Sequence, residues 1–416
     1  MGVGGRVRNH LLLLSRDSDA VQGFQSGVSL HGHTRHSQES LGFIGKFLQS
    51  RRPLRSWIEG QKEYCRRTSG IVLDFDRAYW TPPLCERRAF ALESRQIQEM
   101  GLRPMVSLSD HDNIDACTLL RSDPACSDVP ISTEWTVPFG SAVFHLGVHN
   151  LPAGIAQSAM AAMWEATARA DEHSVLELMA EFSAMPGVLL VFNHPLWNFD
   201  SIAPRLFDSE LARFLDLAND YLHAFELNGM RSHRENRAVL KLAADREQVI
   251  ISGGDRHGCE PNAFLNLTQA SDFPEFVDEI RTGRQSTVLI MPQYGEPLSW
   301  RFYQNFTHVI AEYPQHPEGR RQWDQRTFHP DRDGNVVPMI ELWRVGPPDF
   351  LRTIFAAALM AVNLPVRGLL RRCMSGKNES LLPPSGRGLG WTAAEAGAVV
   401  RSSVPEPDSL MDFAAD

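Results

Sequence analysis

Short apolar runs that end in histidine, acidic or amide residues recur along this chain, with helix-like segments between them. The pattern extends from about residue 25 to residue 292. Continuous apolar runs suit strands that are buried on both faces, and their alternation with helices indicates a largely parallel sheet or barrel. The sequence therefore predicts an α/β fold. The runs are GVSLHGH (27–33), MVSLSDHD (105–112), VPISTEW (129–135), AVFHLGVHN (142–150), GVLLVFNHP (187–195), AFELNG (224–229) and VIISGGDRHG (249–258).

Three of the intervening segments have the features of helices. They cover residues 85–101, 173–187 and 235–248. The second ends in Pro186-Gly187, a common stop signal. In the third, alanine and leucine recur at helical spacing opposite charged residues.

The strand ends supply eight candidate metal ligands. Functional groups in α/β folds gather at the carboxyl ends of the strands, so side chains that follow different strands are expected to meet. The set contains imidazoles and carboxylates without a thiolate, which suits Zn²⁺, Mn²⁺ or Fe²⁺ in a catalytic site. Each residue alone could instead be a hydrogen-bonded structural residue, but eight together favour a cluster of two or three ions. The candidates are His31, His33, His111, Glu134, His145, His194, Asp255 and His257.

The order of these motifs resembles that of the PHP superfamily, named for polymerase and histidinol phosphatase. An HxH motif comes first, followed by SDHDNID, a glutamate with a histidine eleven residues later, NHP and GGDRHG. The resemblance covers about residues 25–290, apart from residues 41–84. It implies a distorted (β/α)7 TIM-like barrel with a trinuclear metal site that hydrolyses phosphoesters. The branch it resembles most contains small phosphoesterases and 5′-end nucleases that act on nucleotides or short oligonucleotides.

The resemblance also assigns roles to the candidate ligands. It implies that His31, His33 and Asp255 hold a first ion, and that Glu134 bridges this ion to a second. The second ion would be completed by His145 and His194, and a third would be held by His111 and His257. The expected cofactors are two or three divalent ions of Mn, Zn or Fe.

One tripeptide departs from the family pattern. The family usually has an aspartate in a Ser-Asp pair shortly after HxHT, whereas this chain reads Ser37-Gln38-Glu39. Gln38 is neutral and a poor ligand for a hard divalent ion, and Glu39 lies one residue late. The sequence therefore leaves the third ion open.

Two further acids could support the ligands. Metal-bound histidines usually donate their second N–H to a carboxylate or carbonyl, and Asp110 is placed for this beside His111. Glu226 could contact the ligand network or a substrate hydroxyl, or it could be a buried acid paired with Arg237.

A phosphoester substrate requires cations, and arginine suits bidentate phosphate binding. The candidates are Arg35, Arg231, Arg234 and Arg256, although Arg234 could equally lie on a solvated helix face. The aromatic residues Trp57, Tyr79, Trp80 and Trp135 could stack on a base or pack in the core.

The net charge of −9 argues against strong binding to long DNA or to an anionic membrane. The expected partner is a small phosphorylated substrate or a short nucleic acid. Six cysteines without a CxxC pair favour a reducing, cytoplasmic location. The apolar segment 350–372 contains Arg352 and Pro365 and is too short to cross a membrane, so no transmembrane segment is expected. The sequence leaves the oligomeric state open.

The predicted function is hydrolysis of a phosphoester by a metal-activated water, with no single protein base assigned. The substrate would be a nucleotide, a short oligonucleotide 5′ end or a small phosphate monoester. The alternative is a metal-binding but catalytically degenerate scaffold, which Gln38 favours. The predicted organisation is an N-terminal segment (1–24), a PHP-like barrel (25–292) with an inserted lid or subdomain (41–84), a C-terminal extension (293–373) and a flexible tail (374–416).

Overall fold

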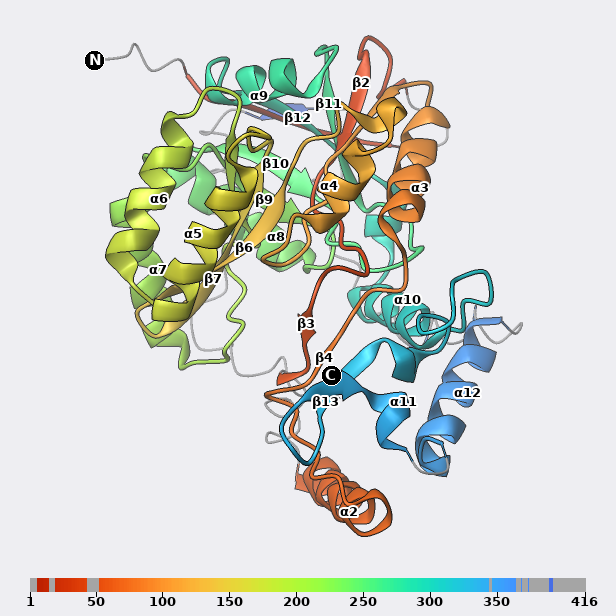
Figure 1. Cartoon of the computed structure of the whole chain (residues 1–416). Coiled ribbons are helices and arrows are strands. Elements are labelled where there is room, and N and C mark those ends of the chain that lie inside the picture. The colour runs from red at the N-terminus through yellow and green to blue at the C-terminus, as the bar shows by residue number, and fades with distance from the viewer. Residues whose placement is uncertain are drawn as a thin grey trace.

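The computed structural model describes residues 6–14, 19–42, 52–343, 346–363, 368, 373 and 389–391. Residues 43–51 of the predicted insertion lie outside the described residues, as does the predicted tail apart from residues 389–391. The described chain is a mixed α/β protein whose strands form three sheets (Figure 1). This confirms the α/β class expected from the sequence.

The largest sheet has six strands, and it includes the first of the predicted strand runs. Strand β2 pairs in parallel with β5, and β1 pairs in parallel with β12. Strand β11 lies between β12 and β2 and is antiparallel to both. Across the sheet, the order is β15 (Leu389–Trp391), β1 (Arg8–Leu13), β12 (Gln285–Ile290), β11 (Phe264–Thr268), β2 (Ser26–Ser29) and β5 (Arg103–Val106).

The second sheet has five strands and departs from the parallel arrangement that was expected. Its parallel part is β8, β9 and β10, whereas β7 is antiparallel to both β6 and β8. The reason is the short connection at Gly140-Ser141, which reverses the chain between β6 and β7; a parallel pair needs a long crossover. The order is β10 (Val249–Gly253), β9 (Ala224–Asn228), β8 (Leu189–Asn193), β7 (Ala142–His149) and β6 (Thr133–Phe139).

These two sheets meet at isolated bridges. Gly32 bridges Arg256 beyond the ends of β2 and β10, and His111 bridges Glu134 where β5 and β6 adjoin, both in the parallel sense. Within the described residues, no sheet closes on itself as a barrel. Each bridge contains or adjoins candidate metal ligands, so the junctions between the sheets locate the site.

Helices cover the two large sheets. In Figure 1, α5, α6 and α7 lie together on one side of the strands and α3 and α4 on another. The three helices predicted from spacing are confirmed as α3, α6 and α8. Strands β2, β8, β9, β10 and β11 are buried at every position, which explains their continuous apolar sequences. The helices are α3 (Glu86–Gln98), α4 (Asp115–Arg121), α5 (Ala156–Arg169), α6 (Glu172–Ala184), α7 (Pro204–Ala218), α8 (His233–Asp245) and α9 (Phe273–Arg281).

The third sheet joins segments that are distant in the sequence. Its four strands are all antiparallel, in the order β14 (Val336–Pro338), β13 (Thr327–Pro330), β4 (Tyr79–Trp80) and β3 (Glu39–Ser40). The predicted insertion and the predicted C-terminal extension therefore pair with each other. This sheet also carries Glu39, which directly follows the HxH region.

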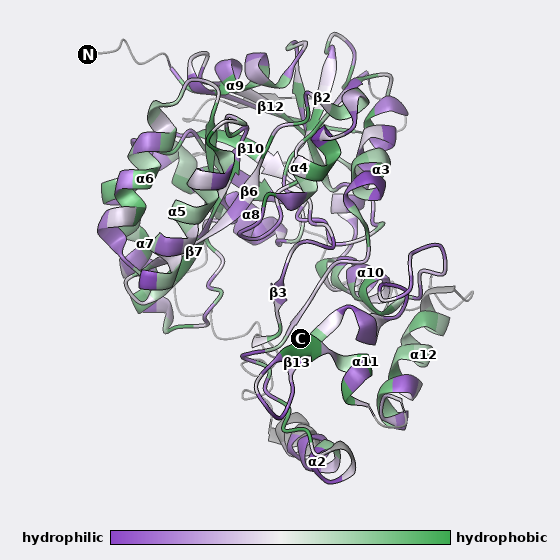
Figure 2. Cartoon of the chain, viewed as in Figure 1, coloured by the Kyte–Doolittle hydropathy of each residue, from purple (hydrophilic) through white to green (hydrophobic). Residues whose placement is uncertain are grey.

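Four helices and three 3-10 turns complete the described chain. In Figure 1, α2, α11 and α12 gather beside the four-stranded sheet, and α10 lies nearer the larger sheets. Figure 2 shows α12 as largely hydrophobic and α3 as largely hydrophilic. No helix of the described residues is both long and apolar enough to cross a membrane. The elements are α2 (Arg52–Ser69), η1 (Pro124–Cys126), η2 (Pro292–Gly295), α10 (Leu298–Ile310), η3 (Trp323–Gln325), α11 (Met339–Leu342) and α12 (Asp349–Asn363).

Candidate metal centre

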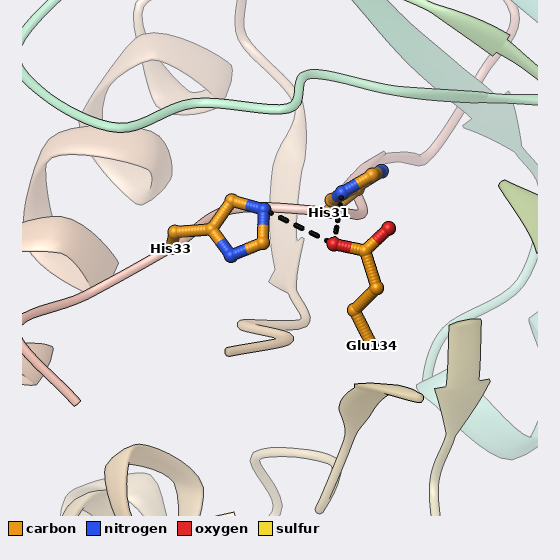
Figure 3. A group of neighbouring side chains, drawn as sticks. All are labelled: His31, His33 and Glu134. Atoms are coloured by element: carbon orange, nitrogen blue, oxygen red, sulfur yellow. Dashed lines mark hydrogen bonds and ion pairs between the residues drawn. The ribbon is translucent and has the colours of Figure 1, made fainter. Parts of the chain in front are cut away.

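The carboxylate of Glu134 lies at the centre of the predicted ligand set. It is 1% exposed and extends from the start of β6. Its Oε2 atom lies 3.0 Å from Nε2 of His31, and 3.4 Å from Nε2 of both His33 and His111. Figure 3 shows the imidazoles of His31 and His33 directed at this oxygen. One carboxylate oxygen thus faces three imidazole nitrogens.

The second oxygen of Glu134 faces a different pair of histidines. Its Oε1 atom lies 3.0 Å from Nε2 of His194 and 3.5 Å from Nδ1 of His145. Asn193 donates a hydrogen bond to the same oxygen at 3.0 Å. The carboxylate therefore stands between two groups of histidines, which is the geometry of a bridging ligand.

Asp255 completes the first group. Its Oδ1 atom lies 3.7 Å from Nε2 of His31, 3.5 Å from Nε2 of His33 and 3.7 Å from Nδ1 of His257. The backbone has positive φ at His31 (63°), His194 (30°) and Asp255 (51°), a region that non-glycine residues seldom adopt. Such local strain clusters at functional sites, and here it occurs where the chain leaves three different strands.

Glu39 takes the place that the sequence left open. Its Oε2 atom lies 3.5 Å from Nε2 of His111 and 3.3 Å from Nε2 of His257. Its Oε1 atom accepts a hydrogen bond from Ser37 at 2.7 Å, whereas Gln38 is exposed. Glu39 lies one residue later than the aspartate of the family pattern. This shift is accommodated because Glu39 begins β3 and pairs with Trp80 of β4. Of the two candidates, Glu39 is therefore the residue that lies among the predicted ligands.

Glu226 contacts the ligand network through His31. Its Oε1 atom lies 2.5 Å from Nδ1 of His31, and its Oε2 atom accepts hydrogen bonds from the backbone N–H of His194 and from Asn228, both at 2.9 Å. All of these groups are buried. The carboxylate therefore fixes the orientation of His31 from the side opposite Glu134, which is the role expected of a residue behind a metal ligand.

Asp110 supports the HxHT loop and does not contact a ligand imidazole. Its two oxygens accept hydrogen bonds from the backbone N–H of Thr34 at 2.5 Å and from the Thr34 hydroxyl at 2.7 Å. Burial raises the pKa of Asp110 to about 6, against the lowering effect of these bonds. The residue holds the loop that carries His33.

The carboxylates of the site are held ionised by the histidines around them. Burial raises the pKa of Glu134, but nearby imidazoles, first that of His31 and then that of His111, outweigh it and hold the pKa well below the usual range. The same balance lowers the pKa values of Glu39 and Asp255. Three buried carboxylates are therefore available as anionic ligands.

Five of the candidate histidines divide into two kinds. Burial lowers the pKa of His31, His33, His111, His145 and His257, and neighbouring carboxylates oppose this effect. The carboxylates prevail at His31, whose pKa is raised, at His111, where it reaches about 10, and at His257, where it reaches about 9. Burial prevails at His33, where the pKa falls to about 4, and at His145, where it is well below the usual value.

Two buried nitrogens indicate that the donor set fits a cation. Nε2 of His33 and Nδ1 of His145 have no hydrogen-bond partner among the described residues, although each lies near a carboxylate oxygen. Buried polar atoms are rarely left unpaired. Several triads in the site, such as His31, His33 and Glu134, offer ligand atoms within 4.8 Å of one another. Imidazole and carboxylate groups at this spacing suit divalent ions such as Zn²⁺ and Mn²⁺.

The four predicted phosphate-binding arginines lie in different surroundings. The guanidinium of Arg231 lies 4.0 Å from the ring centroid of Trp197, and its Nη2 is 4.0 Å from Oδ2 of Asp255. Arg35 is partly exposed and lies 3.4 Å from Glu86. Arg234 is exposed on α8, and Arg256 is 3% exposed.

The side chain of Arg256 is directed at α3. Its Nη1 donates to Gln96 at 3.2 Å and lies 3.7 Å from Oε1 of Glu93. Arg231 therefore lies beside a predicted metal ligand, Asp255, whereas Arg256 packs inside the fold.

Aromatic side chains surround part of the centre. Trp197 packs edge-on against His194, with ring centroids 4.8 Å apart, and Trp80 lies 5.6 Å from the ring of His257. Trp135 is completely buried in the core, which confirms the packing interpretation for that residue. The side chain of Trp57 lies outside the described part of the chain.

Sequence reasoning missed several residues of the centre. Asn193 donates a hydrogen bond to Glu134, and its place in the NHP motif directly before His194 could have identified it. Ser37, which bonds Glu39 and accepts from the backbone N–H of His111 at 3.1 Å, was visible in the HxHT region. The sequence did not indicate that Trp197 belongs to the site, because its position beside Arg231 depends on the packing of two separate loops.

No protein-family model and no curated protein matches this chain. Among solved structures, the chain is similar to a Bifidobacterium adolescentis protein that is provisionally described as a metal-dependent phosphoesterase. The identity is 15%, the match covers 49% of this chain and 92% of the other, and the TM-score is 0.29. It is also similar to an amidohydrolase from Chromobacterium violaceum, with 13% identity, 56% and 88% coverage and a TM-score of 0.31. The function is therefore inferred from the residues of the chain itself.

Proposed function

We propose that this chain is a metal-dependent phosphoesterase with a centre of two or three divalent ions. The observation that supports this most directly is Glu134, which stands between two groups of buried histidines. The unpartnered nitrogens of His33 and His145 face the same carboxylate. This arrangement is costly without cations, because it concentrates buried polar groups that lack partners.

The proposed ligand groups follow the contacts around each carboxylate. The first group is His31, His33 and Asp255, and Glu134 bridges it to the second. The second group is His145 and His194. The third group is His111, His257 and Glu39, in which Glu39 replaces the aspartate of the family pattern.

The bound ions would supply Lewis acidity and an activated water at neutral pH. The residues of the chain would position the phosphoester beside them. Arg231 would bind a phosphoryl oxygen, because its guanidinium already lies next to Asp255 and offers planar donors. Trp197 and its neighbour Phe199 would exclude bulk water from the His145 side of the site, where both rings pack on that imidazole. Water exclusion strengthens the electrostatic contacts to a phosphoryl group.

The proposed architecture is a distorted barrel of seven strands. The five-stranded sheet would continue into β2 and β5 through the bridge between Gly32 and Arg256, and return to β6 through the bridge between His111 and Glu134. This ring would bring the seven strand ends together at one mouth. The arrangement agrees with the barrel that the PHP resemblance implies.

The alternative of a metal-binding scaffold rested on Gln38. That residue is exposed, and Glu39 supplies a carboxylate in the position that Gln38 could not fill. The enzymatic interpretation is therefore the better supported of the two. The proposed substrate is a nucleotide, an oligonucleotide 5′ end or a small phosphate monoester.

The decisive experiment combines metal analysis with a substrate panel. The purified full-length protein would be loaded with Mn²⁺, Zn²⁺ or Fe²⁺ and tested on aryl phosphate, nucleotides and 5′-phosphorylated oligonucleotides. We expect at least two ions per chain and phosphate release that depends on them. Stoichiometric metal binding without turnover of any phosphoester would contradict the proposed function and support the scaffold.

A further inference from the structure

Arg231 is presented to the metal centre by a short turn. It follows β9 and directly precedes Ser232, whose hydroxyl accepts from the N–H of Glu235 and caps α8. Its side chain is 11% exposed and packs over Trp197. Within the described residues, its buried Nε has no hydrogen-bond partner, and Oε1 of Glu235 lies 3.8 Å away. A donor of Arg231 is thus left available beside the centre.

The turn is held from outside the predicted barrel by Arg301. This residue lies on α10 in the predicted C-terminal extension and is 3% exposed. Its guanidinium donates to the carbonyl oxygen of Gly229, to that of Arg231 at 3.1 Å and to that of Glu296 at 3.3 Å. Burial lowers the pKa of Arg301 to about 10, so the group remains a cation at neutral pH. One side chain therefore fixes both ends of the turn 229–231.

A series of side-chain contacts also connects Arg301 to His31. Arg301 lies 4.5 Å from the ring centroid of Tyr294, whose hydroxyl accepts from Asn236 at 2.5 Å. Asn236 also donates to the carbonyl oxygen of Asn228 at 3.0 Å. Asn228 in turn bonds Glu226, the carboxylate that orients His31. The end of β9 is thus tied to the extension by side chains that are all buried.

We propose that Arg301 is a positioning residue that aims Arg231 at the substrate phosphate. The inference rests on the proposed function, and it assigns to the C-terminal extension a part in substrate binding. A guanidinium places donors at several points of a rigid fork, whereas a lysine has one nitrogen and does not span the two carbonyl oxygens in the same way. If lysine replaced Arg301, the turn 229–231 would be free to move, and Arg231 would move with it.

The test is the affinity of the manganese-loaded, full-length protein for inorganic phosphate, measured by calorimetry. We expect Arg231→Ala and Arg301→Lys each to weaken phosphate binding by about tenfold, the order of one lost charge-assisted contact. The double variant should bind no more weakly than Arg231→Ala alone, because Arg301 acts through Arg231. A purely structural role for Arg301 would instead give additive losses.

Arg326 provides a matched control. It is also buried, and it donates to four carbonyl oxygens, among them those of Val309 and Ala311, in the same extension. Arg326→Lys should lower the unfolding temperature but leave phosphate affinity unchanged. If Arg301→Lys does not fold, Tyr294→Leu removes the ring beneath Arg301 and should weaken phosphate binding only when Arg231 is present.

Two results would overturn the inference, and they are distinguishable. If the unchanged protein binds phosphate and the folded Arg301→Lys variant binds it equally well, Arg301 does not position Arg231. If the unchanged, metal-loaded protein binds no phosphate and hydrolyses no phosphoester, the proposed function fails and the inference fails with it.

Discussion

At the scale of single residues, the position of Glu39 is the feature that most affects how many ions the proposed centre would hold. Glu39 contacts both His111 and His257, and the adjacent Gln38 is exposed. Burial raises the pKa of Glu39, but the imidazoles of His257 and His111 outweigh it and hold that pKa well below the usual range, so the carboxylate is available as an anion between them. The proposed third ion would therefore depend on Glu39.

Replacement of Glu39 by glutamine should remove one ion. Glutamine keeps the shape of the side chain but loses the charge that a hard divalent ion prefers. We expect the metal content of Glu39→Gln to fall by about one ion per chain, while the ions at Glu134 remain. Gln38→Ala is the matched control and should bind as much metal as the unchanged protein. Equal metal content in both variants would show that Glu39 is no ligand.

Replacement of Glu226 tests the support behind His31. Glu226→Gln retains an acceptor near Nδ1 of His31 but removes the negative charge that favours the metal-binding tautomer. Such changes typically weaken metal affinity by about 10- to 100-fold. Competition with a fluorescent chelator would measure this loss. If the metal affinity of Glu226→Gln were unaltered, Glu226 would contribute only to the packing of β9 and not to the support of His31.

At the scale of elements, the junction of α6, β8 and α9 contains a histidine that affects stability at low pH. Nδ1 of His223 accepts from the backbone N–H of Leu190 at 2.9 Å, and its Nε2 lies 3.2 Å from the hydroxyl of Ser183. Burial, with a further contribution from the Arg281 guanidinium, lowers the pKa of His223 to about 3. The folded state therefore holds this imidazole neutral.

The sign of the pH dependence follows from that pKa. Between about pH 6.5 and pH 3 the unfolded chain binds a proton at His223 that the folded chain does not, so the free energy of unfolding falls as the pH falls. The contribution approaches about 1.4 kcal/mol per pH unit in that window. His223→Gln should flatten the dependence in denaturant titrations between pH 7 and pH 4.5. The exposed His173→Gln is the control, and an identical slope for both variants would contradict the prediction.

The elements also show which parts of the fold were predictable. Strand runs and three helices followed from hydrophobic periodicity, because buried strands and amphipathic helices leave that pattern in the sequence. Most of the eight ligand candidates came together because they follow strand ends, whereas Glu134 lies at the start of β6 and His145 lies within β7. The antiparallel pairing of β7 was not predictable from composition, since it depends on the turn at Gly140-Ser141.

Other features depend on contacts between distant segments. Arg256 was grouped with the phosphate-binding arginines because it lies inside a metal motif, but its side chain points at Gln96 and Glu93. Sequence position does not define side-chain direction next to a residue with positive φ, as at Asp255. Arg301 could not be identified, because it acts on a turn about 70 residues earlier.

At the scale of the whole molecule, the segments outside the predicted barrel converge on the candidate metal centre. The four-stranded sheet pairs β13 of the extension with β4 of the insertion, and β4 with β3, which carries Glu39. The extension also contacts the turn that presents Arg231, through Arg301. The predicted barrel segment and its additions therefore build the candidate site together, and loss of metal should lower the stability of the entire chain.

Removal of metal should lower the unfolding temperature of the protein. A ligand that binds only the folded state stabilises it by about 2.7 kcal/mol at a concentration 100 times its Kd, and the ligands here are assembled only by folding. We expect a chelator to lower the midpoint of thermal unfolding by several degrees, and added Mn²⁺ or Zn²⁺ to restore it. Differential scanning calorimetry would measure the change.

The variant Glu134→Gln separates specific binding from a general effect of the chelator. Glu134 is the carboxylate shared by the two histidine groups, so its loss should remove most of the response to metal while leaving the helices and sheets intact. The chelator should then lower the unfolding temperature of this variant by much less than that of the unchanged protein, because only the group around Glu39 would still hold an ion. A metal response of normal size in Glu134→Gln would mean that the stabilising ions do not depend on Glu134, the carboxylate whose two oxygens face His31 and His194.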